Sequence, residues 1–536
     1  NIGNDTDLIL AAHEVVLSRR LDDEETNRTC QVLLDIGDKP ANEEAYEEVL
    51  KRAGKMGIKV FPFETSADAQ EIIKGLSGKG KNLYYLGMLS AIYNMPKEAL
   101  ISEINLTFGK KLKEEIFQKN IALFEYGYRD AQTLFPISYY VKENCRPVGE
   151  DSMMIDGNSA LSLGIIDAGI KLYSGYPITP ASSVMHTLAK LLPSYGGMVH
   201  QAEDEIAAIG AAIGAYFGGV PSATGTSGPG LSLKQEFIGY ASVAEIPLVI
   251  LDVQRSGPST GMPTKTEQSD LPAVIFGSHG DNTKIVISVS NVIDCFYAPQ
   301  MARYLAEKLR LPVFILSDFL TANSYKVIKK LQANQVNSIN DVPDFVFERF
   351  HIKRLPDNIE MVRTIQADPG TPGQMRRVTG LNTDEKGSVN YFSGANQRSH
   401  RIRNQKVHHV ARALTVPEMF GKTEGADILV IGWGSSRGVI EEAITNGCKQ
   451  GMNIAGMHFR IVHPLPLMLK DIFKKFKKVV TVEGAYGDDL KFPPLAMLLR
   501  AETLMEIKPI ICQATGRPIR PRGILEKINE TLKASA

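Results

Sequence analysis

Four polar or glycine-rich turns interrupt the apolar segments between residues 171 and 281. Each turn follows a stretch that reads as a strand, and the first two lead into helical patterns. Alternation of strands and helices is typical of parallel sheets, which bind ligands at the carboxyl ends of their strands. The pattern predicts an α/β fold in which one pocket is built by the turns at 174–180, 201–205, 224–230 and 254–264.

The turns carry side chains suited to acid–base chemistry and to binding a carboxylate. The second turn holds Glu203, Asp204 and Glu205 at the start of a helix, where negative charge is stabilised. The fourth turn holds Arg255, whose planar guanidinium can bind a carboxylate through two parallel hydrogen bonds. Helix capping and packing of a surface arginine would explain the same residues without any reaction. The combination of all four turns favours catalysis.

The other two turns contribute backbone and small side chains. Gly225 and Gly228 leave the third turn open to close approach by a ligand, although a tight strand-to-helix connection has the same composition. In the first turn Thr179 precedes Pro180, and proline is favoured at the first position of a helix. We therefore expect Thr179 at the mouth of the sheet.

In order and spacing, the turns resemble the α subunit of the 2-oxoacid:ferredoxin oxidoreductases. The resemblance is strongest over residues 157–327. It implies an enzyme that uses thiamine diphosphate, iron–sulfur clusters and coenzyme A to decarboxylate a 2-oxoacid oxidatively. It rests on Y-P-I-T-P at 176–180, Q-A-E-D-E at 201–205, G-T-S-G-P-G at 225–230 and R-S-G-P-S-T-G at 255–261.

The resemblance also implies a role for individual residues. Glu205 is expected to hydrogen-bond the aminopyrimidine nitrogen N1′ of thiamine diphosphate and so promote formation of the ylid. Arg255 and Thr179 are expected to bind the substrate carboxylate. Further cofactor contacts are expected from Tyr176, Pro177, Gly225, Thr226, Ser227 and Gly228.

Two sites that the implied reaction needs have no match in this chain. The metal that bridges the diphosphate is usually held by a Gly-Asp-Gly turn with a later Asn, and residues 280–282 and 487–489 only approach that pattern. The five cysteines are scattered without a C-x-x-C pair, which favours free buried thiols over cluster ligands. We therefore expect a β subunit that supplies Mg²⁺, a [4Fe-4S] cluster and part of the thiamine diphosphate site, in a dimer of heterodimers that reduces ferredoxin.

Composition excludes several other classes of partner. Lys plus Arg and Asp plus Glu are equal at 60 each, so no charge excess favours nucleic acid or an anionic membrane. No apolar run is long enough to span a bilayer, and Asn1 begins neither a signal peptide nor an initiator sequence. The expected location is the cytoplasm.

A strand pattern at residues 5–11 has nothing before it to pair with, so we expect that some of the protein precedes residue 1.

A chain of 536 residues is too long for one hydrophobic core. Together with the resemblance, the changes in periodicity predict a multi-domain protein with doubly wound parallel sheets. The expected parts are a γ-type α/β domain at 1–125, a linker at 126–156, a pyrimidine-binding catalytic domain at 157–327, an irregular connector at 328–403 and a transketolase C-terminal-like domain at 404–536.

Several weaker motifs favour structural explanations. Residues 432–436 lack the spacing of a dinucleotide fingerprint, and His458 and His463 have no third ligand in view. Ser259 and Thr260 are weak candidates for a ligand contact. Within residues 483–488, the family's usual Asn and Gln are replaced by Ala485 and Asp488, which weakens any ligand role of that loop.

Other functions remain open at this point. A doubly wound sheet permits an NAD-dependent dehydrogenase, but the nucleotide fingerprint is missing. A catalytically silent transketolase-like assembly subunit is a third possibility. Within the resembled family, the fused γ–α arrangement and the Q-A-E-D-E turn favour 2-oxoglutarate as substrate, with pyruvate or a broad range of 2-oxoacids as alternatives.

Overall fold

The computed structural model describes residues 5–22, 26–37, 43–136, 138–139, 149 and 151–533. These residues fall into two compact units, one within Gly3–Gly149 and the other within Glu150–Ala536. Each unit combines helices with predominantly parallel sheets, so the predicted α/β class is confirmed. No helix of the described chain is long and apolar enough to cross a membrane.

The smaller unit is built on a sheet of three parallel strands, and the strand expected at residues 5–11 is present as the first of them. The strands pair in the order β1 (Thr6–Ala11), β2 (Thr26–Asp35) and β3 (Lys59–Phe63). The helices are α1 (Glu14–Leu21), α2 (Glu43–Lys55), α3 (Ala67–Gly75), α4 (Lys81–Ile92), α5 (Lys97–Phe108) and α6 (Glu114–Leu134).

Helices α4 and α6 approach each other closely because each presents a glycine to the other. A Cβ atom on Gly87 would stand 2.0 Å from the Phe124 carbonyl oxygen, and one on Gly127 would stand 1.9 Å from the Tyr84 carbonyl oxygen. Helix α6 continues to Leu134, so the first part of the expected linker is helical. Residues 137, 140–148 and 150 of that segment lie outside the described residues.

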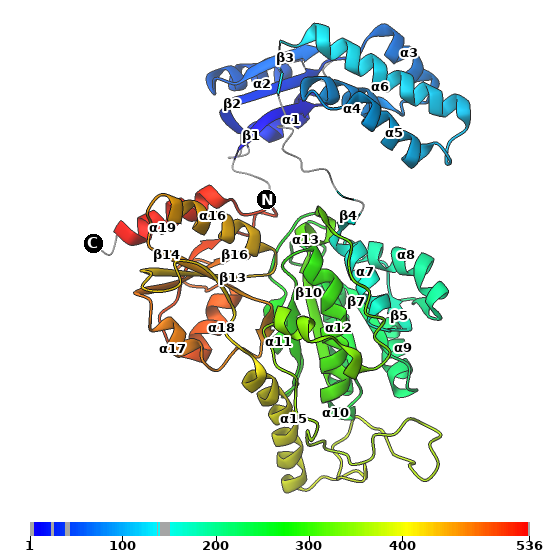
Figure 1. The fold of residues 1–536 in the computed structure, drawn as a ribbon, viewed down its shortest axis with the longest axis vertical. Helices are drawn as coiled ribbons and strands as arrows, with labels where there is room; N and C mark the ends of the chain where they lie inside the picture. The colour runs from blue at the N-terminus through cyan, green and yellow to red at the C-terminus, as the bar shows by residue number, and fades with distance from the viewer. Residues whose placement is uncertain are drawn as a thin grey trace. The chain divides into compact units, whose positions relative to one another are not determined.

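The larger unit is organised around a seven-stranded sheet (Figure 1). Its strand order is β15-β9-β10-β8-β7-β5-β6, and the antiparallel pair is β15 with β9. The strands are β5 (Leu172–Gly175), β6 (Met198–Gln201), β7 (Ser222–Thr226), β8 (Leu248–Gln254), β9 (Ile285–Ser288), β10 (Pro312–Asp318) and β15 (Ile461–His463).

The order in which the chain visits these strands creates a switch point. From β5 the chain moves to β6 on one side, then returns to β7 on the other side and continues outward to β8. In open parallel sheets, the ligand crevice lies outside the carboxyl ends of the strands at such a reversal. The crevice is therefore expected between the turns that follow β5 and β7.

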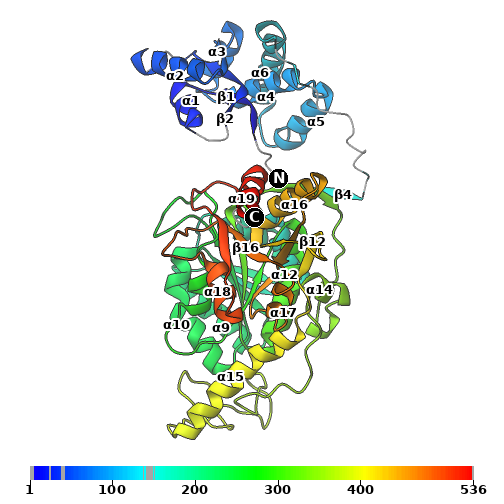
Figure 2. The ribbon, with the colours of Figure 1, turned by 90° about the vertical axis from the view of Figure 1, so that its left-hand side faces the viewer.

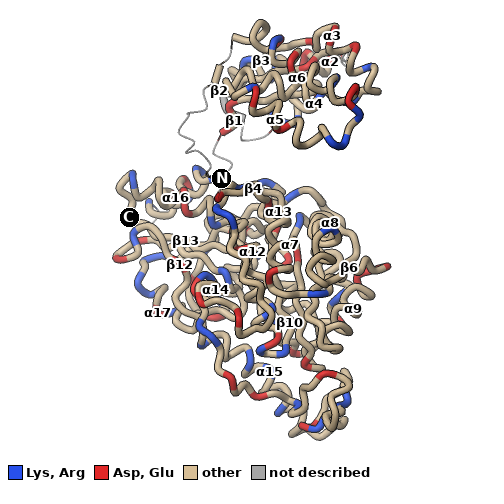
Figure 3. The backbone as a smooth tube through the Cα atoms, turned by 45° about the vertical axis from the view of Figure 1, so that its right-hand side comes forward, with Lys and Arg blue, Asp and Glu red and all other residues tan. Residues whose placement is uncertain are grey.

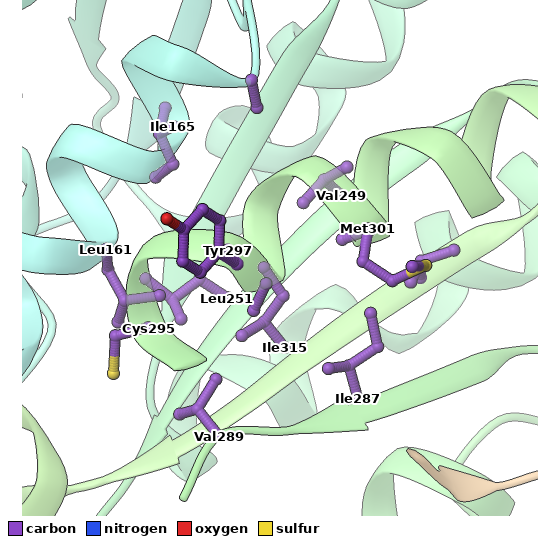
Figure 4. Close-up of a cluster of buried hydrophobic side chains, with 14 of the residues drawn as sticks. Leu161, Ile165, Val249, Leu251, Ile287, Val289, Cys295, Tyr297, Met301 and Ile315 are labelled. Carbon is purple, nitrogen blue, oxygen red and sulfur yellow. The ribbon is translucent and has the colours of Figure 1, made fainter. Parts of the chain in front are cut away.

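Helices cover both faces of the seven-stranded sheet. Successive strand residues point to opposite sides, so each face contributes its own apolar side chains to a core. Leu251 and Ile315 pack with residues of α7 and α12 on one face (Figure 4). Ile250 and Phe314 pack with α9, α10 and the C-terminal strands on the other. The helices are α7 (Gly157–Asp167), α8 (Ser182–Leu191), α9 (Glu205–Phe217), α10 (Gly228–Ala244), α11 (Leu271–Phe276), α12 (Val292–Leu309) and α13 (Phe319–Asn323).

The segment expected as an irregular connector has regular structure at both ends. Strand β11 (Tyr325–Lys329) pairs with β4 (Ser152–Asp156), and helix α14 spans Asp344–Arg349. Helix α15 (Ser393–Ala413) starts within the expected connector and crosses its expected end at residue 403. Its first turns carry Asn, Gln, Arg and His without an apolar period, so their helical nature was missed. Residues 350–392, all described, form no helix or strand and lie beside α15 (Figures 1 and 2).

This connector is attached to the end of α10 through the fully buried carboxylate of Glu245. Glu245 forms an ion pair with the equally buried Lys406 at 2.7 Å. It also accepts hydrogen bonds from the backbone N–H groups of Val362 at 2.8 Å and Arg363 at 3.0 Å, and from Gln366 Nε2 at 3.0 Å. Burial alone would raise the pKa of Glu245, but the Lys406 charge and these hydrogen bonds outweigh it and hold the pKa below its ordinary value.

The last part of the chain forms a five-stranded sheet in the order β12-β14-β13-β16-β17, in which β12 runs antiparallel. Between β14 and β16 the chain sends β15 to the seven-stranded sheet, so both sheets belong to one compact unit. The strands are β12 (Glu418–Gly421), β13 (Ile428–Trp433), β14 (Ile454–Phe459), β16 (Lys478–Glu483) and β17 (Lys508–Cys512). The helices are α16 (Arg437–Lys449), α17 (Leu469–Phe473), α18 (Pro494–Thr503) and α19 (Pro521–Lys533).

Charged residues of both signs are intermixed along the backbone of each unit (Figure 3). The cysteines are only partly as expected. Cys30 and Cys295 are buried free thiols, whereas Cys448 and Cys512 are partly exposed, and Cys145 lies outside the described residues.

Candidate active site

The four turns lie together at the carboxyl edge of the seven-stranded sheet. Gly175, at the end of β5, is paired with Gln201 on one side and with Gly225 on the other. Thr226 of β7 is paired in turn with Asp252 of β8. The turns that follow these strands therefore flank the switch point and form one continuous edge.

Of the three acidic residues in the second turn, only Glu205 is buried. It is the first residue of α9 and is 7% exposed, whereas Glu203 and Asp204 are exposed. Asp204 instead caps the helix by accepting a hydrogen bond from the Ala207 N–H at 2.7 Å. One acidic residue thus stabilises the helix start, as the structural explanation requires, while its neighbour is free to meet a ligand.

The Glu205 carboxyl group fits into a space left by a glycine. A Cβ atom on Gly230 would stand 2.6 Å from Glu205 Oε1 and 2.2 Å from Thr226 Oγ1. Any larger residue at position 230 would displace one of these two groups. The glycine-rich turn therefore decides where the Glu205 carboxyl group can lie.

The rest of this turn is equally crowded. A Cβ atom on Gly225 would stand 1.8 Å from Tyr173 Oη, and one on Gly228 would stand 2.7 Å from Asp270 Oδ1. Ser227 is fully buried, and its hydroxyl oxygen has no hydrogen-bond partner among the described residues. A buried hydroxyl without a partner is costly, and a ligand at this edge would satisfy it.

Arg255 and Thr179 are in direct contact. Arg255 is 7% exposed, and its Nη1 donates a hydrogen bond to the Thr179 backbone carbonyl oxygen at 2.7 Å. Arg255 Nε is buried and has no acceptor in the described part of the chain. The contact uses the Thr179 backbone, which leaves the exposed Thr179 hydroxyl and the rest of the guanidinium for a ligand.

The outer wall of the site is exposed. Tyr176 is 41% exposed, and Pro177, Ser259 and Thr260 are exposed as well. Helix α8 begins at Ser182, so Pro180 precedes the helix and does not open it as expected. The first turn is therefore longer than the sequence indicated, and it carries Tyr176 and Pro177 out to the surface of the edge.

A group of carboxyl groups near Arg255 was not predicted from the sequence. Asp252 is fully buried, and neither of its oxygens has a hydrogen-bond partner within the described residues. Burial, and then the charge of Asp270, raise the pKa of Asp252 well above its ordinary value. Burial and the charge of Glu267 raise the pKa of Asp270 to about 7, although Arg255 opposes the shift. The available signal was one acidic residue within an otherwise apolar strand.

Gln268 joins this site to the C-terminal sheet. Its Nε2 donates to the Trp433 carbonyl oxygen at 2.8 Å, and its Oε1 accepts from the Gly484 N–H at 2.9 Å. The turns after β13 and β16 are thus packed against the fourth turn of the catalytic sheet. The turn at 432–436 has the packing role that its spacing indicated.

Two histidines of the C-terminal segment, His458 and His463, have lowered pKa values. Burial, and then the Arg460 charge, lower the pKa of His458 to about 3, and its Nε2 lies 3.1 Å from the Gly434 carbonyl oxygen. Burial lowers the pKa of His463 to about 4. Within the described residues, no three or more His, Cys, Asp or Glu side chains are grouped to hold a metal ion.

Two known protein families match this chain. A family described as "Pyruvate flavodoxin/ferredoxin oxidoreductase, thiamine diP-bdg" matches residues 163–395, which include all four turns. A second family, "Pyruvate ferredoxin/flavodoxin oxidoreductase", matches residues 2–129.

Individual proteins show the same relationship. The chain is 35% identical over 387 residues to the 2-oxoglutarate synthase subunit KorA of Methanothermobacter marburgensis, covering 70% of this chain and 98% of that subunit. It is 34% identical to the 2-oxoglutarate oxidoreductase subunit KorA of Mycobacterium tuberculosis, covering 81% of this chain and 65% of the relative.

A solved structure agrees with these matches. It is described as 2-oxoglutarate:ferredoxin oxidoreductase from Magnetococcus marinus with 2-oxoglutarate, coenzyme A and succinyl-CoA bound. The similarity has a TM-score of 0.82 at 31% identity and covers 98% of this chain and 88% of that one. The chain therefore belongs to the 2-oxoacid:ferredoxin oxidoreductase family, an enzyme family with a thiamine diphosphate-binding domain, and is similar over most of its length to proteins named as its α subunit.

Proposed function

We propose that this chain holds the aminopyrimidine of thiamine diphosphate and the 2-oxoacid in an enzyme that converts 2-oxoglutarate and coenzyme A into succinyl-CoA and CO2, with the electrons passing to ferredoxin. The observation that carries the proposal is the placement of Glu205, a nearly buried carboxyl group that reaches the turn after β7 beside Gly230 and Thr226. The names of the similar proteins support 2-oxoglutarate as the substrate.

The residues at this edge fit the pyrimidine half of the cofactor. Thiamine diphosphate, when bound, supplies the nucleophilic carbon and the electron sink of the reaction. Glu205 would hold and transfer the proton at the pyrimidine nitrogen, which is the task of a carboxyl group in a position that excludes water. The unpartnered Ser227 hydroxyl and the Thr226 side chain would line the pocket beside it. Gly225 and Gly228 would keep the backbone open, and Tyr176 and Pro177 would cover the outer side.

Arg255 and Thr179 would bind the carboxylate of the 2-oxoacid. The hydrogen bond from Arg255 to the Thr179 carbonyl oxygen fixes the guanidinium, and its remaining N–H groups can hold a carboxylate in place.

Replacing Arg255 with Lys is expected to raise the Michaelis constant for 2-oxoglutarate, because an ammonium group cannot hold both Thr179 and a carboxylate with the same geometry. We expect a change of about tenfold or more, the range of a lost charge-assisted hydrogen bond. Steady-state kinetics of the assembled enzyme measure it. Arg354, an exposed arginine of the connector, offers the control substitution to Lys. Unchanged kinetics in Arg255→Lys would make Arg255 a structural residue.

A partner chain would complete the site. Thiamine diphosphate needs a metal at its diphosphate, and electron transfer to ferredoxin needs an iron–sulfur cluster, and the described residues show no side-chain group for a metal ion. We propose a β subunit that supplies Mg²⁺ and a [4Fe-4S] cluster and meets this chain at the edge of β5 and β7. An obligate interface of this kind buries above roughly 2,000 Å² and suits a dimer of heterodimers.

Assembly with a β subunit tests the proposed function. The purified chain alone is expected to reduce no ferredoxin, whereas the complex is expected to do so with coenzyme A and 2-oxoglutarate. A panel of 2-oxoacids that includes pyruvate would rank the substrates by kcat/KM. Tight thiamine diphosphate binding and ferredoxin reduction by this chain alone would contradict the division between subunits. A complex that is inactive on the whole panel would contradict the enzymatic role.

A further inference from the structure

Lys234 is a fully buried amine beside the proposed acid–base residue. It lies on α10, and its side chain has no exposed surface. Lys234 Nζ donates hydrogen bonds to the Glu205 backbone carbonyl oxygen at 3.0 Å and to Thr224 Oγ1 at 3.1 Å. It therefore connects the first residue of α9 to the middle of β7, directly behind the site.

Lys234 and Gly230 act on Glu205 from the same side of α10. Residues four apart in a helix lie on one face, one turn above the other. Gly230 leaves room for the Glu205 carboxyl group, since a Cβ atom there would stand 2.6 Å from Oε1. Lys234 holds the Glu205 backbone. One face of α10 thus lies against both the backbone and the carboxyl group of Glu205.

The surroundings of Lys234 leave its charge removable. An ammonium group has three N–H donors, but only two acceptors are within reach in the described residues. Burial lowers the pKa of Lys234 from its ordinary 10.5 to about 8, although the charges of Glu205 and Asp204 oppose this shift. Both of these charges come from the start of α9, where Asp204 is the N-cap, and from β7 the Thr224 hydroxyl accepts a hydrogen bond from Nζ. Lys234 is therefore mostly charged at neutral pH and becomes neutral in mildly alkaline solution.

We propose that Lys234 is a positioning residue for Glu205: it fixes the backbone from which that side chain leaves the helix, and it places a removable positive charge beside the carboxyl group. This inference rests on the proposed function of Glu205. The charged amine holds the Glu205 backbone carbonyl oxygen and so fixes the point from which the carboxyl group reaches the pyrimidine nitrogen. Loss of the charge, by high pH or by substitution, should weaken this hold on the Glu205 backbone, because a charge-assisted hydrogen bond is stronger than a neutral one, and so slow the reaction.

The substitution Lys234→Met tests the proposal in the assembled enzyme, because it keeps an unbranched side chain of nearly the same length and removes the charge and N–H groups. We expect exchange of the thiamine C2 proton, and kcat with it, to fall by up to about a hundredfold, the scale of a catalytic group misplaced by about 1 Å. The Michaelis constant for the 2-oxoacid should change far less. The wild-type exchange rate should fall as pH rises through about 8, and this step should be absent in the variant.

A second measurement needs no cofactor. Because the folded-state pKa of Lys234 is lowered from 10.5 to about 8, the unfolded chain binds the extra proton between these values. The stability of the wild type should therefore rise relative to Lys234→Met as pH increases through this interval, by several degrees in Tm. Glu205→Gln removes a charge that opposes the shift, so it should move the lower edge of the interval to lower pH. An interval that stays in place would overturn the coupling.

Lys284 provides the matched control. It is also buried, and burial lowers its pKa to about 8, but its Nζ donates to the Ile275 carbonyl oxygen and not to Glu205. Lys284→Met should leave the C2 exchange rate and its pH profile unchanged. Slow exchange in Glu205→Gln with wild-type exchange in Lys234→Met would overturn this inference alone. Wild-type exchange in Glu205→Gln would overturn the proposed role of Glu205 and this inference with it.

Discussion

Replacing Glu205 with Gln is expected to slow exchange of the C2 proton of bound thiamine diphosphate about a hundredfold or more, the usual contribution of a general acid–base group. Glutamine fills the space beside Gly230 as glutamate does, so the pocket keeps its shape. An amide cannot give up a proton to the pyrimidine nitrogen. Exchange into deuterated water, followed by quenching and NMR of the released cofactor, measures the rate in the assembled enzyme.

The control for this experiment lies two residues earlier. Glu203 has the same charge in the same turn but is exposed, so Glu203→Gln should exchange at the wild-type rate. Equal rates in Glu205→Gln and the wild type would remove Glu205 from the mechanism. Equal losses in both variants would mean that the net charge of the turn, and not the buried carboxyl group, supports the reaction.

Replacing Glu245 with Gln is expected to destabilise the larger unit by about 3–5 kcal/mol, the cost of breaking a buried ion pair. The substitution leaves the Lys406 ammonium group in a fully buried position without its counter-charge. It also weakens the acceptor for the Val362 and Arg363 N–H groups, which anchor the connector. Fluorescence of Trp433, the single tryptophan of the chain, reports unfolding of this unit in a urea titration.

Two further variants separate burial from charge. Glu360→Gln removes an exposed carboxylate of the same connector and should cost less than about 1 kcal/mol. The double variant Glu245→Gln/Lys406→Met removes both buried charges and should recover a large part of the loss. If Glu245→Gln unfolds at the wild-type urea concentration, the connector is held by other contacts.

The sequence was sufficient to locate the four turns of the catalytic sheet, the strands that precede them and the helices that follow the first two. Residues 181–192 and 206–217 have a clear helical period, and α8 and α9 occupy these positions within a few residues. The strand that ends at the fourth turn is a continuous apolar run, and β8 occupies it. Such local patterns are read directly from the chain. Once the strands and helices are placed, the residues between them are the residues of the turns.

The sequence did not predict how these elements are arranged in space. Which strand lies next to β5, and hence which turns share the switch point, depends on long-range pairing. Lys234 stands in a helix with an ordinary mixture of residues, so nothing in the pattern marks it as buried. Helix α15 is stabilised by packing of a narrow stripe that includes Ile402 and Val410, while its polar residues hide the period. In each case tertiary contacts decide what local propensity leaves open.

The short strand β15 joins the C-terminal part of the chain to the seven-stranded sheet, so the chain cannot be divided cleanly at the expected domain boundary. A gene cut at residue 404 would look natural from sequence alone, yet it would remove the strand that covers β9. The exposed edge of β9 would then offer unpaired N–H and C=O groups beside Ile285, Val286 and Ile287, which is the usual template for aggregation. Exchange of the last segment between related proteins would therefore have to carry its edge strand with it. Recombination would therefore preserve the fold only where both sheets are exchanged together.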